Sequence, residues 1–137
     1  DATEEALSPQ RHIGNLHAPL VVAYGTLETP EFQRQAREFA AAVKAAGLDY
    51  VNIPVSHTPL DDRALDEIQH ALHEIIGPRH AFLYCNSGNR VGAALIPYLM
   101  LDRGVSEESA VDAAIRMGTR HAELLEWALD YVRRHPR

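Results

Sequence analysis

The stretch Ala81–Gly92, AFLYCNSGNRVG, joins a short apolar run, a turn of small polar residues and the start of an apolar helix. The apolar run ends at Cys85, the single cysteine of the chain, and Arg90 follows five positions later. A strand that leads through a turn into a helix is the basic unit of α/β folds, in which ligands bind beyond the carboxyl ends of the strands. The stretch therefore predicts both a fold class and the place of a ligand site.

The rest of the chain repeats this alternation. Strands are expected near 19–25, 49–55 and 81–84, after an irregular lead-in over 1–18. Helices are expected from Pro30, from 61–62, over 91–102 with a kink or late start at Pro97, from Ser106, and from Thr119. The pattern predicts a single α/β domain over 1–137, in three layers, with a central, mostly parallel sheet of about 3–4 strands flanked by helices.

The composition limits the classes of partner that the chain is expected to bind. The chain has 137 residues and a formal net charge of −6 with scattered basic residues, which argues against nucleic acid as a partner. No apolar run is long enough to cross a membrane. A single free thiol suits the cytoplasm, although the first residue is not Met and export stays open. His70 and His73 share a helix without a metal-binding framework, so neither a metal nor a cofactor is expected.

The loop after the third expected strand has the chemistry of an oxyanion site. A thiol at the positive end of a helix has a lowered pKa, so Cys85 is a candidate nucleophile. Arg90 can donate a planar pair of hydrogen bonds to an oxyanion. The backbone amides of four small residues can form an anion-binding nest: Asn86, Ser87, Gly88 and Asn89. The expected ligand is a small anion such as phosphate or sulfate, or a phosphorylated substrate.

The loop CNSGNRVG (85–92) resembles that of bacterial phosphatase-like proteins of the tyrosine and dual-specificity phosphatase superfamily. The likeness covers about residues 45–135 and includes AGLDYVNIPVSHTPLDDRALDEIQ and ALIPYLMLDRGVSEESAVDAAIRMG. It implies that Cys85 forms a phosphocysteine and that Arg90 and the loop amides hold the phosphoryl oxygens. It also implies an acid in the loop after the second strand. His57 is favoured there because its ordinary pKa lies near neutrality, whereas Asp61 and Asp62 suit the next helix N-terminus equally well.

Two features of the loop leave other functions open. Four residues separate Cys85 from Arg90, the length found in rhodanese sulfurtransferases, whereas phosphatases usually have five. Tyr84 and Val91 stand where many phosphatases have His and Ser or Thr. The alternatives to a cysteine-dependent phosphatase-like hydrolase are therefore a rhodanese-like sulfurtransferase with a persulfide on Cys85, and a catalytically silent scaffold that only binds an oxyanion.

The first third resembles a different family. EALSPQRHI and APLVVAYGTLETPEFQRQAREFAAAVKAAG, within 1–47, resemble a late segment of an α/β-hydrolase of the esterase or arylformamidase type. The chain would then be a chimera, natural or engineered, with its phosphatase-like part over 48–137. Glu28 would lie near the acid of a hydrolase triad, but no Gly-x-Ser-x-Gly elbow is present, so hydrolase chemistry is not expected. Moderate stability and a homodimer formed through exposed apolar surface are further predictions.

Overall fold

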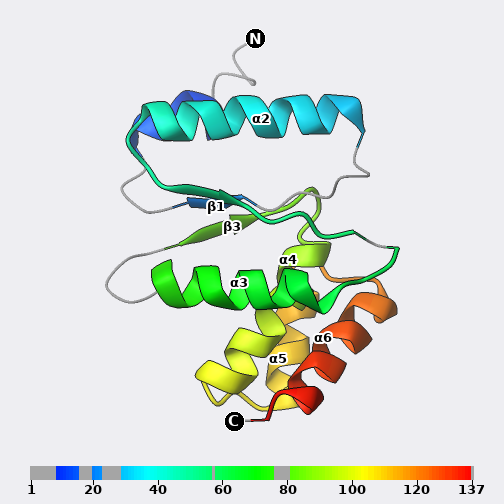
Figure 1. Ribbon diagram of the computed structural model, residues 1–137. Helices are drawn as coiled ribbons and strands as arrows, with labels where there is room; N and C mark the ends of the chain where they lie inside the picture. The colour runs from blue at the N-terminus through cyan, green and yellow to red at the C-terminus, as the bar shows by residue number, and fades with distance from the viewer. Residues whose placement is uncertain (1–8, 16–19, 23–28, 57, 76–80, 137) are drawn as a thin grey trace.

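A computed structural model describes residues 9–15, 20–22, 29–56, 58–75 and 81–136 (Figure 1). In chain order the elements are the 3-10 helix η1 (Pro9–Asn15), β1 (Leu20–Val22), α2 (Pro30–Ala45), β2 (Tyr50–Asn52), α3 (Asp62–Ile75), β3 (Phe82–Tyr84), α4 (Asn89–Pro97), the π-helical η2 (Tyr98–Asp102), α5 (Glu107–Met117) and α6 (Ala122–Arg134). Within these ranges no helix combines the length and the apolar character needed to span a membrane.

The described strands form one parallel sheet in the order β2-β1-β3. Leu20 of β1 lies opposite Tyr50 of β2 and Phe82 of β3. The chain thus leaves β1 to one side and returns past it to the other, so right-handed crossovers place α2 and α3 on opposite faces of the sheet. Figure 1 shows α2 on one side and α3 to α6 on the other. The predicted α/β class is confirmed, although each strand is only three residues long.

Two predicted helix starts carry the expected side-chain caps. The Thr29 hydroxyl accepts a hydrogen bond from the Phe32 amide at 3.3 Å, and Pro30 occupies the first helical position. The Ser106 hydroxyl accepts from the Ser109 amide at 3.3 Å. Each cap satisfies an amide that has no partner inside the helix, and this is why α2 and α5 begin where the sequence predicts.

Three expectations about the elements are wrong. The lead-in is not irregular throughout, because η1 forms and buries Ile13 in a short helix that lacks the periodicity of an α-helix. The helix after the cysteine loop begins at Asn89 rather than Val91. The irregularity expected at Pro97 is present, because the helix becomes π-helical after this residue, whose ring nitrogen cannot donate to the helical ladder. The last helix begins at Ala122, because the Thr119 hydroxyl bonds elsewhere.

Hydrophobic clusters lie on both sides of the sheet. On the α2 side, Ile13 and Val43 are buried and pack with Phe39 and Tyr84. The larger cluster joins α3 to α6 and the segment after β2. Its most completely buried large side chains are Leu65, Leu72, Ile96 and Leu124. The elements around the cysteine loop are therefore held by this larger core.

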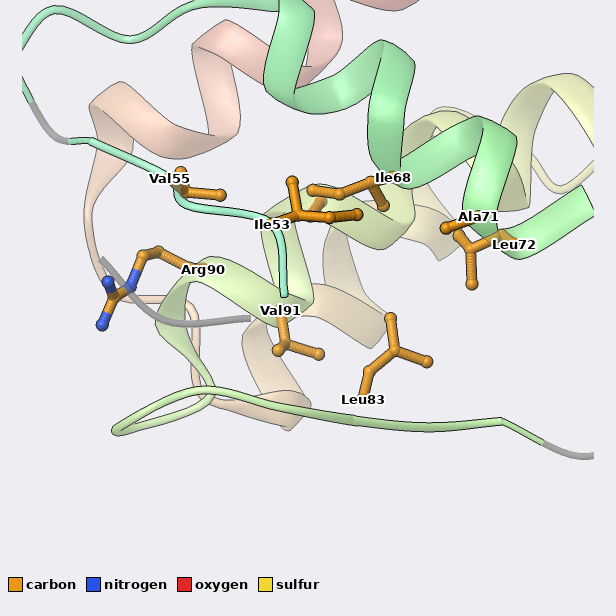
Figure 2. A pocket seen from close by; sticks show the side chains of 9 residues that line it. Ile53, Val55, Ile68, Ala71, Leu72, Leu83, Arg90 and Val91 are labelled. Atoms are coloured by element: carbon orange, nitrogen blue, oxygen red, sulfur yellow. The ribbon is translucent and has the colours of Figure 1, made fainter. Parts of the chain in front are cut away.

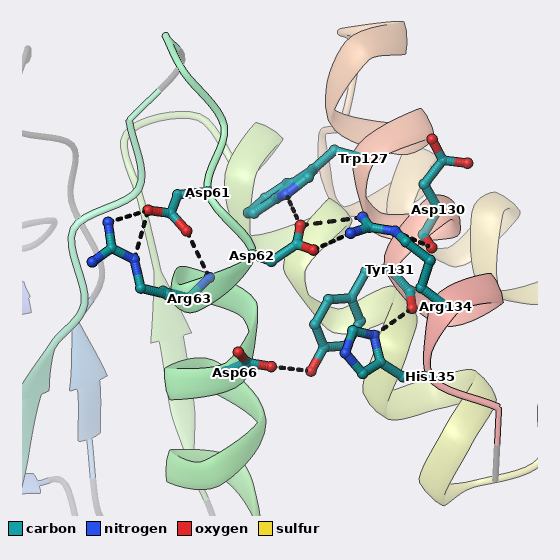
Figure 3. Close-up of polar contacts among 9 residues, drawn as sticks. All are labelled: Asp61, Asp62, Arg63, Asp66, Trp127, Asp130, Tyr131, Arg134 and His135. Carbon is teal, nitrogen blue, oxygen red and sulfur yellow. Dashed lines mark hydrogen bonds and ion pairs between the residues drawn. The ribbon is translucent and has the colours of Figure 1, made fainter.

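Helices α3 and α6 are also joined by polar contacts (Figure 3). Asp62 accepts a hydrogen bond from Trp127 Nε1 at 3.1 Å and pairs with Arg134. One turn later, Asp66 accepts from the Tyr131 hydroxyl at 2.6 Å. Trp127 and Tyr131 are buried, and buried polar atoms of such rings need partners. These contacts fix the first turns of α3 against α6.

We expect Asp62→Ala to lower the free energy of unfolding by about 1–3 kcal/mol, because the buried Trp127 N–H loses its acceptor. Arg134→Gln is the matched control. It removes the exposed ion pair with Asp62 but leaves the Trp127 hydrogen bond, so it should lower the free energy of unfolding by less than about 1 kcal/mol. Urea denaturation of both variants measures the difference. Equal losses would show that the Trp127 hydrogen bond contributes nothing beyond the surface ion pair.

Candidate functional site

Cys85 directly follows β3, and its loop ends where α4 begins at Asn89. The thiol is free, and the residue is 8% exposed. β3 lies next to β1, and β2 lies on the other side of β1, so the strand order reverses direction at the β1–β3 pair. Such switch points are where ligands bind in open α/β sheets, at the carboxyl ends of the strands. The structure thus places Cys85 at the position that the fold reserves for a ligand.

The loop packs backbone to backbone against the turn that ends α5. Gly88 has a φ of +79°, and a Cβ there would lie 2.0 Å from the Met117 carbonyl oxygen. Gly118 has a φ of +123°, and its Cβ would lie 2.4 Å from the Ser87 carbonyl oxygen. Both the left-handed conformation and the close approach exclude a side chain at these two positions. The outer side of the loop is therefore shaped by the α5–α6 turn.

Arg90 lies in the first turn of α4 and is 6% exposed. Burial lowers the pKa of its guanidinium. The first turn contains no acidic residue, and the N-cap position is held by Gly88, which has no side chain to accept from the helix amides. A cation at the positive end of a helix opposes the dipole, so the arrangement concentrates positive potential. An anion is the ligand that would offset it.

A small cavity of about 20 Å³ lies beside this residue. Figure 2 shows the side chains that line it. Its lining comprises Ile53, Val55, Ile68, Ala71, Leu72, Leu83, Arg90, Val91 and Ala94. The Arg90 stem lines the cavity, while its guanidinium extends away from the apolar side chains. Val91 is partly buried and lines the same cavity. Because Val55 lies in the same lining, the segment after β2 starts next to the Arg90 stem.

The structure describes two of the three candidate proton donors, Asp61 and Asp62. His57 lies outside the described residues. Asp61 accepts from the Arg63 amide at 2.9 Å and from Arg63 Nε at 2.8 Å, and these hydrogen bonds hold the pKa of the Asp61 carboxyl below its usual range. Asp62 is bound to Trp127. Both aspartates therefore stabilise the start of α3, and an ionised Asp61 is poorly suited to donate a proton near neutrality.

The predicted oxyanion-binding residues divide into two groups. The side chains of Asn86 and Ser87 are exposed. Asn89 instead turns toward the α5–α6 turn, where its Oδ1 accepts from the amides of Arg120 at 2.9 Å and His121 at 3.3 Å. The Asn89 carbonyl oxygen Oδ1 is therefore committed to the α5–α6 turn.

Thr119 is the residue at this site that the sequence did not identify. Its hydroxyl donates to the Asn89 carbonyl oxygen at 3.0 Å, and the residue is 1% exposed. A Thr ahead of a helix indicates a cap, and nothing in the spacing pointed to a partner thirty positions away.

Solved structures share this fold. The "Putative phosphatase (DUF442)" of Shewanella putrefaciens CN-32 matches with a TM-score of 0.73 at 13% identity, over 96% of this chain and 85% of that chain. TpbA of P. aeruginosa matches with 0.62 at 18%, over 99% and 76%. Tk-PTP in the active form matches with 0.69 at 19%, over 92% and 87%. No protein-family model matches the sequence, and neither does any curated protein at the level of sequence.

These matches place the chain in an α/β, phosphatase-like fold. The match to the Shewanella structure spans nearly the whole chain, so the first third lies within the same fold. The comparisons give no support to a chimera with an α/β-hydrolase or to the rhodanese alternative.

Gly88→Ala should cost about 1–3 kcal/mol more than a matched substitution, because the new methyl group would overlap the Met117 carbonyl. The matched control is Gly104→Ala: Gly104 has a φ of +66° but nothing within 4 Å of the built Cβ. Its cost should be the left-handed conformation alone, about 1–2 kcal/mol. Urea unfolding compares the two, and equal losses would mean that the loop can move off the α5–α6 turn.

Proposed function

We propose that this chain is a cysteine-dependent phosphatase-like hydrolase acting on phosphate monoesters. The proposal rests on one observation: Cys85 and Arg90 are both buried and lie at the two ends of the loop that leads into the N-terminus of α4. A variant of TpbA with this fold is in complex with pTyr, which supports a phosphorylated substrate of the same class here.

In the proposed reaction the Cys85 thiolate attacks phosphorus as the bond to the ester oxygen breaks. The Arg90 guanidinium and the amides of the loop would hold the non-bridging oxygens, where negative charge must be stabilised throughout the transfer. A proton donor neutralises the departing oxygen. Water then attacks the phosphocysteine, releasing inorganic phosphate and restoring the thiolate.

Turnover should be slow, because two neighbours of the loop give the thiolate no help. Tyr84 packs with Phe32 and Phe39 on the α2 side, at ring-centroid distances of 6.3 and 6.0 Å. Burial, and next the charge of the Cys85 thiolate, raise the pKa of Tyr84, so its hydroxyl stays neutral near pH 7. Val91 offers no hydroxyl and points into the apolar cavity.

The first test is vanadate-sensitive hydrolysis of p-nitrophenyl phosphate. Cys85→Ser should abolish phosphate release, and Arg90→Lys should lower kcat/KM by about 10²-fold or more, because lysine cannot form the bidentate pair. Circular dichroism checks that both variants fold. Release that persists in Cys85→Ser would refute the proposal. Sulfur transfer from thiosulfate to cyanide, with one sulfur gained on Cys85, would favour the sulfurtransferase instead. Binding of tungstate with neither activity would favour a silent scaffold.

The second test concerns the proton donor, for which His57 is our proposal because Asp61 is held ionised by Arg63. His57→Asn should slow hydrolysis of phenyl phosphate by about 10²-fold or more but change p-nitrophenyl phosphate little, since nitrophenolate leaves without a proton. The ratio of the two rates at several pH values measures this. A larger selective loss in Asp61→Asn would instead assign the role to Asp61.

A further inference from the structure

The contacts behind the cysteine loop come from outside the loop itself. Asn89 reaches the Arg120 and His121 amides, and the Thr119 hydroxyl reaches back to the Asn89 carbonyl. The Thr119 side chain thus binds the backbone of Asn89, and the Asn89 side chain binds the backbone of the two residues that follow Thr119. We call Asn89 and Thr119 the clamp.

The clamp sits where the two segments touch most closely. Gly92 lies about one helical turn after Asn89 in α4. A Cβ on Gly92 would lie 2.2 Å from Thr119 Oγ1 and 2.6 Å from the Ala114 carbonyl oxygen. The Thr119 amide donates to that same Ala114 carbonyl at 3.0 Å. Thr119 is therefore fixed to the last turn of α5 by its backbone, and its buried hydroxyl has little freedom to bond elsewhere.

One peptide unit connects the clamp to the proposed chemistry. The Asn89 carbonyl and the Arg90 amide belong to the same planar trans peptide, so they point in opposite directions. A hydrogen bond from Thr119 to that carbonyl therefore fixes the direction of the Arg90 N–H, at the open N-terminal end of α4. Amides at this end of a helix are the ones that bind anions.

We propose that Asn89 and Thr119 are positioning residues that set the anion affinity of the Cys85 loop and the reactivity of its thiol. The inference rests on the proposed function, because it concerns the same loop. Neither clamp side chain needs to touch the substrate. They act by fixing the orientation of the Asn89–Arg90 peptide and the backbone conformation of the loop from Gly88 onward.

The test compares Thr119→Val, which removes the hydroxyl at nearly constant shape, with Thr119→Ser, which keeps it. The rate of alkylation of Cys85 by iodoacetamide is measured near neutral pH in the full chain, with and without tungstate. The wild type should react faster than free cysteine and should be protected by tungstate. Thr119→Val should slow the alkylation and weaken tungstate protection by about tenfold, the effect of one hydrogen bond. Thr119→Ser should stay within about twofold of the wild type.

Ser106→Ala controls for stability alone. It removes the cap at the opposite end of α5, so it should lower the melting temperature without changing the alkylation rate or tungstate protection. Asn89→Ala repeats the measurement from the other half of the clamp if Thr119→Val does not fold. A wild type that reacts no faster than free cysteine and is not protected by tungstate would refute the proposed function. A wild type that behaves as expected, with clamp variants that are only less stable, would overturn the clamp and leave the proposed function standing.

Discussion

The contact on which the site depends is the backbone approach between Ser87–Gly88 and Met117–Gly118. It leaves no room for a side chain at Gly88 or Gly118, so the curvature of the loop is matched to the α5–α6 turn. Helix α6 then extends this dependence to α3 through Asp62. Because α3 follows the loop expected to supply the proton donor, a single helix braces both halves of the candidate site.

The electrostatics of the site are local and run against the net charge of the chain. The formal charge is −6, yet the N-terminal end of α4 carries a buried guanidinium and no acidic residue in its first turn. Removing Arg90 from water weakens its hold on the proton, which is the direction of its pKa shift. An oxyanion at the helix end would favour the charged form and lower the cost of burial. Net charge alone would have pointed away from such a ligand.

Sequence patterns that depend on residues a few positions apart predicted the helices and strands of the fold well. The caps at Thr29 and Ser106 and the strand leading to Cys85 depend on near neighbours, so their sequence patterns were sufficient. The roles of Asn89 and Thr119 depend on partners about thirty positions apart, which no local spacing records. Residues 1–47 resemble another family because a buried strand and an amphipathic crossover helix have the same requirements in many α/β folds.

The short loop explains why the clamp lies where it does. Four residues separate Cys85 from Arg90, and α4 begins at the last of them, Asn89, so the last residue of the loop is also the first residue of the helix. A longer loop could separate the peptides that face an anion from those that anchor the helix. Under the proposed function the Asn89–Arg90 peptide serves both purposes, and the Thr119 hydroxyl holds it from outside the loop. The α5–α6 turn provides that support through Thr119, while the side chain of Asn89 secures the turn in return.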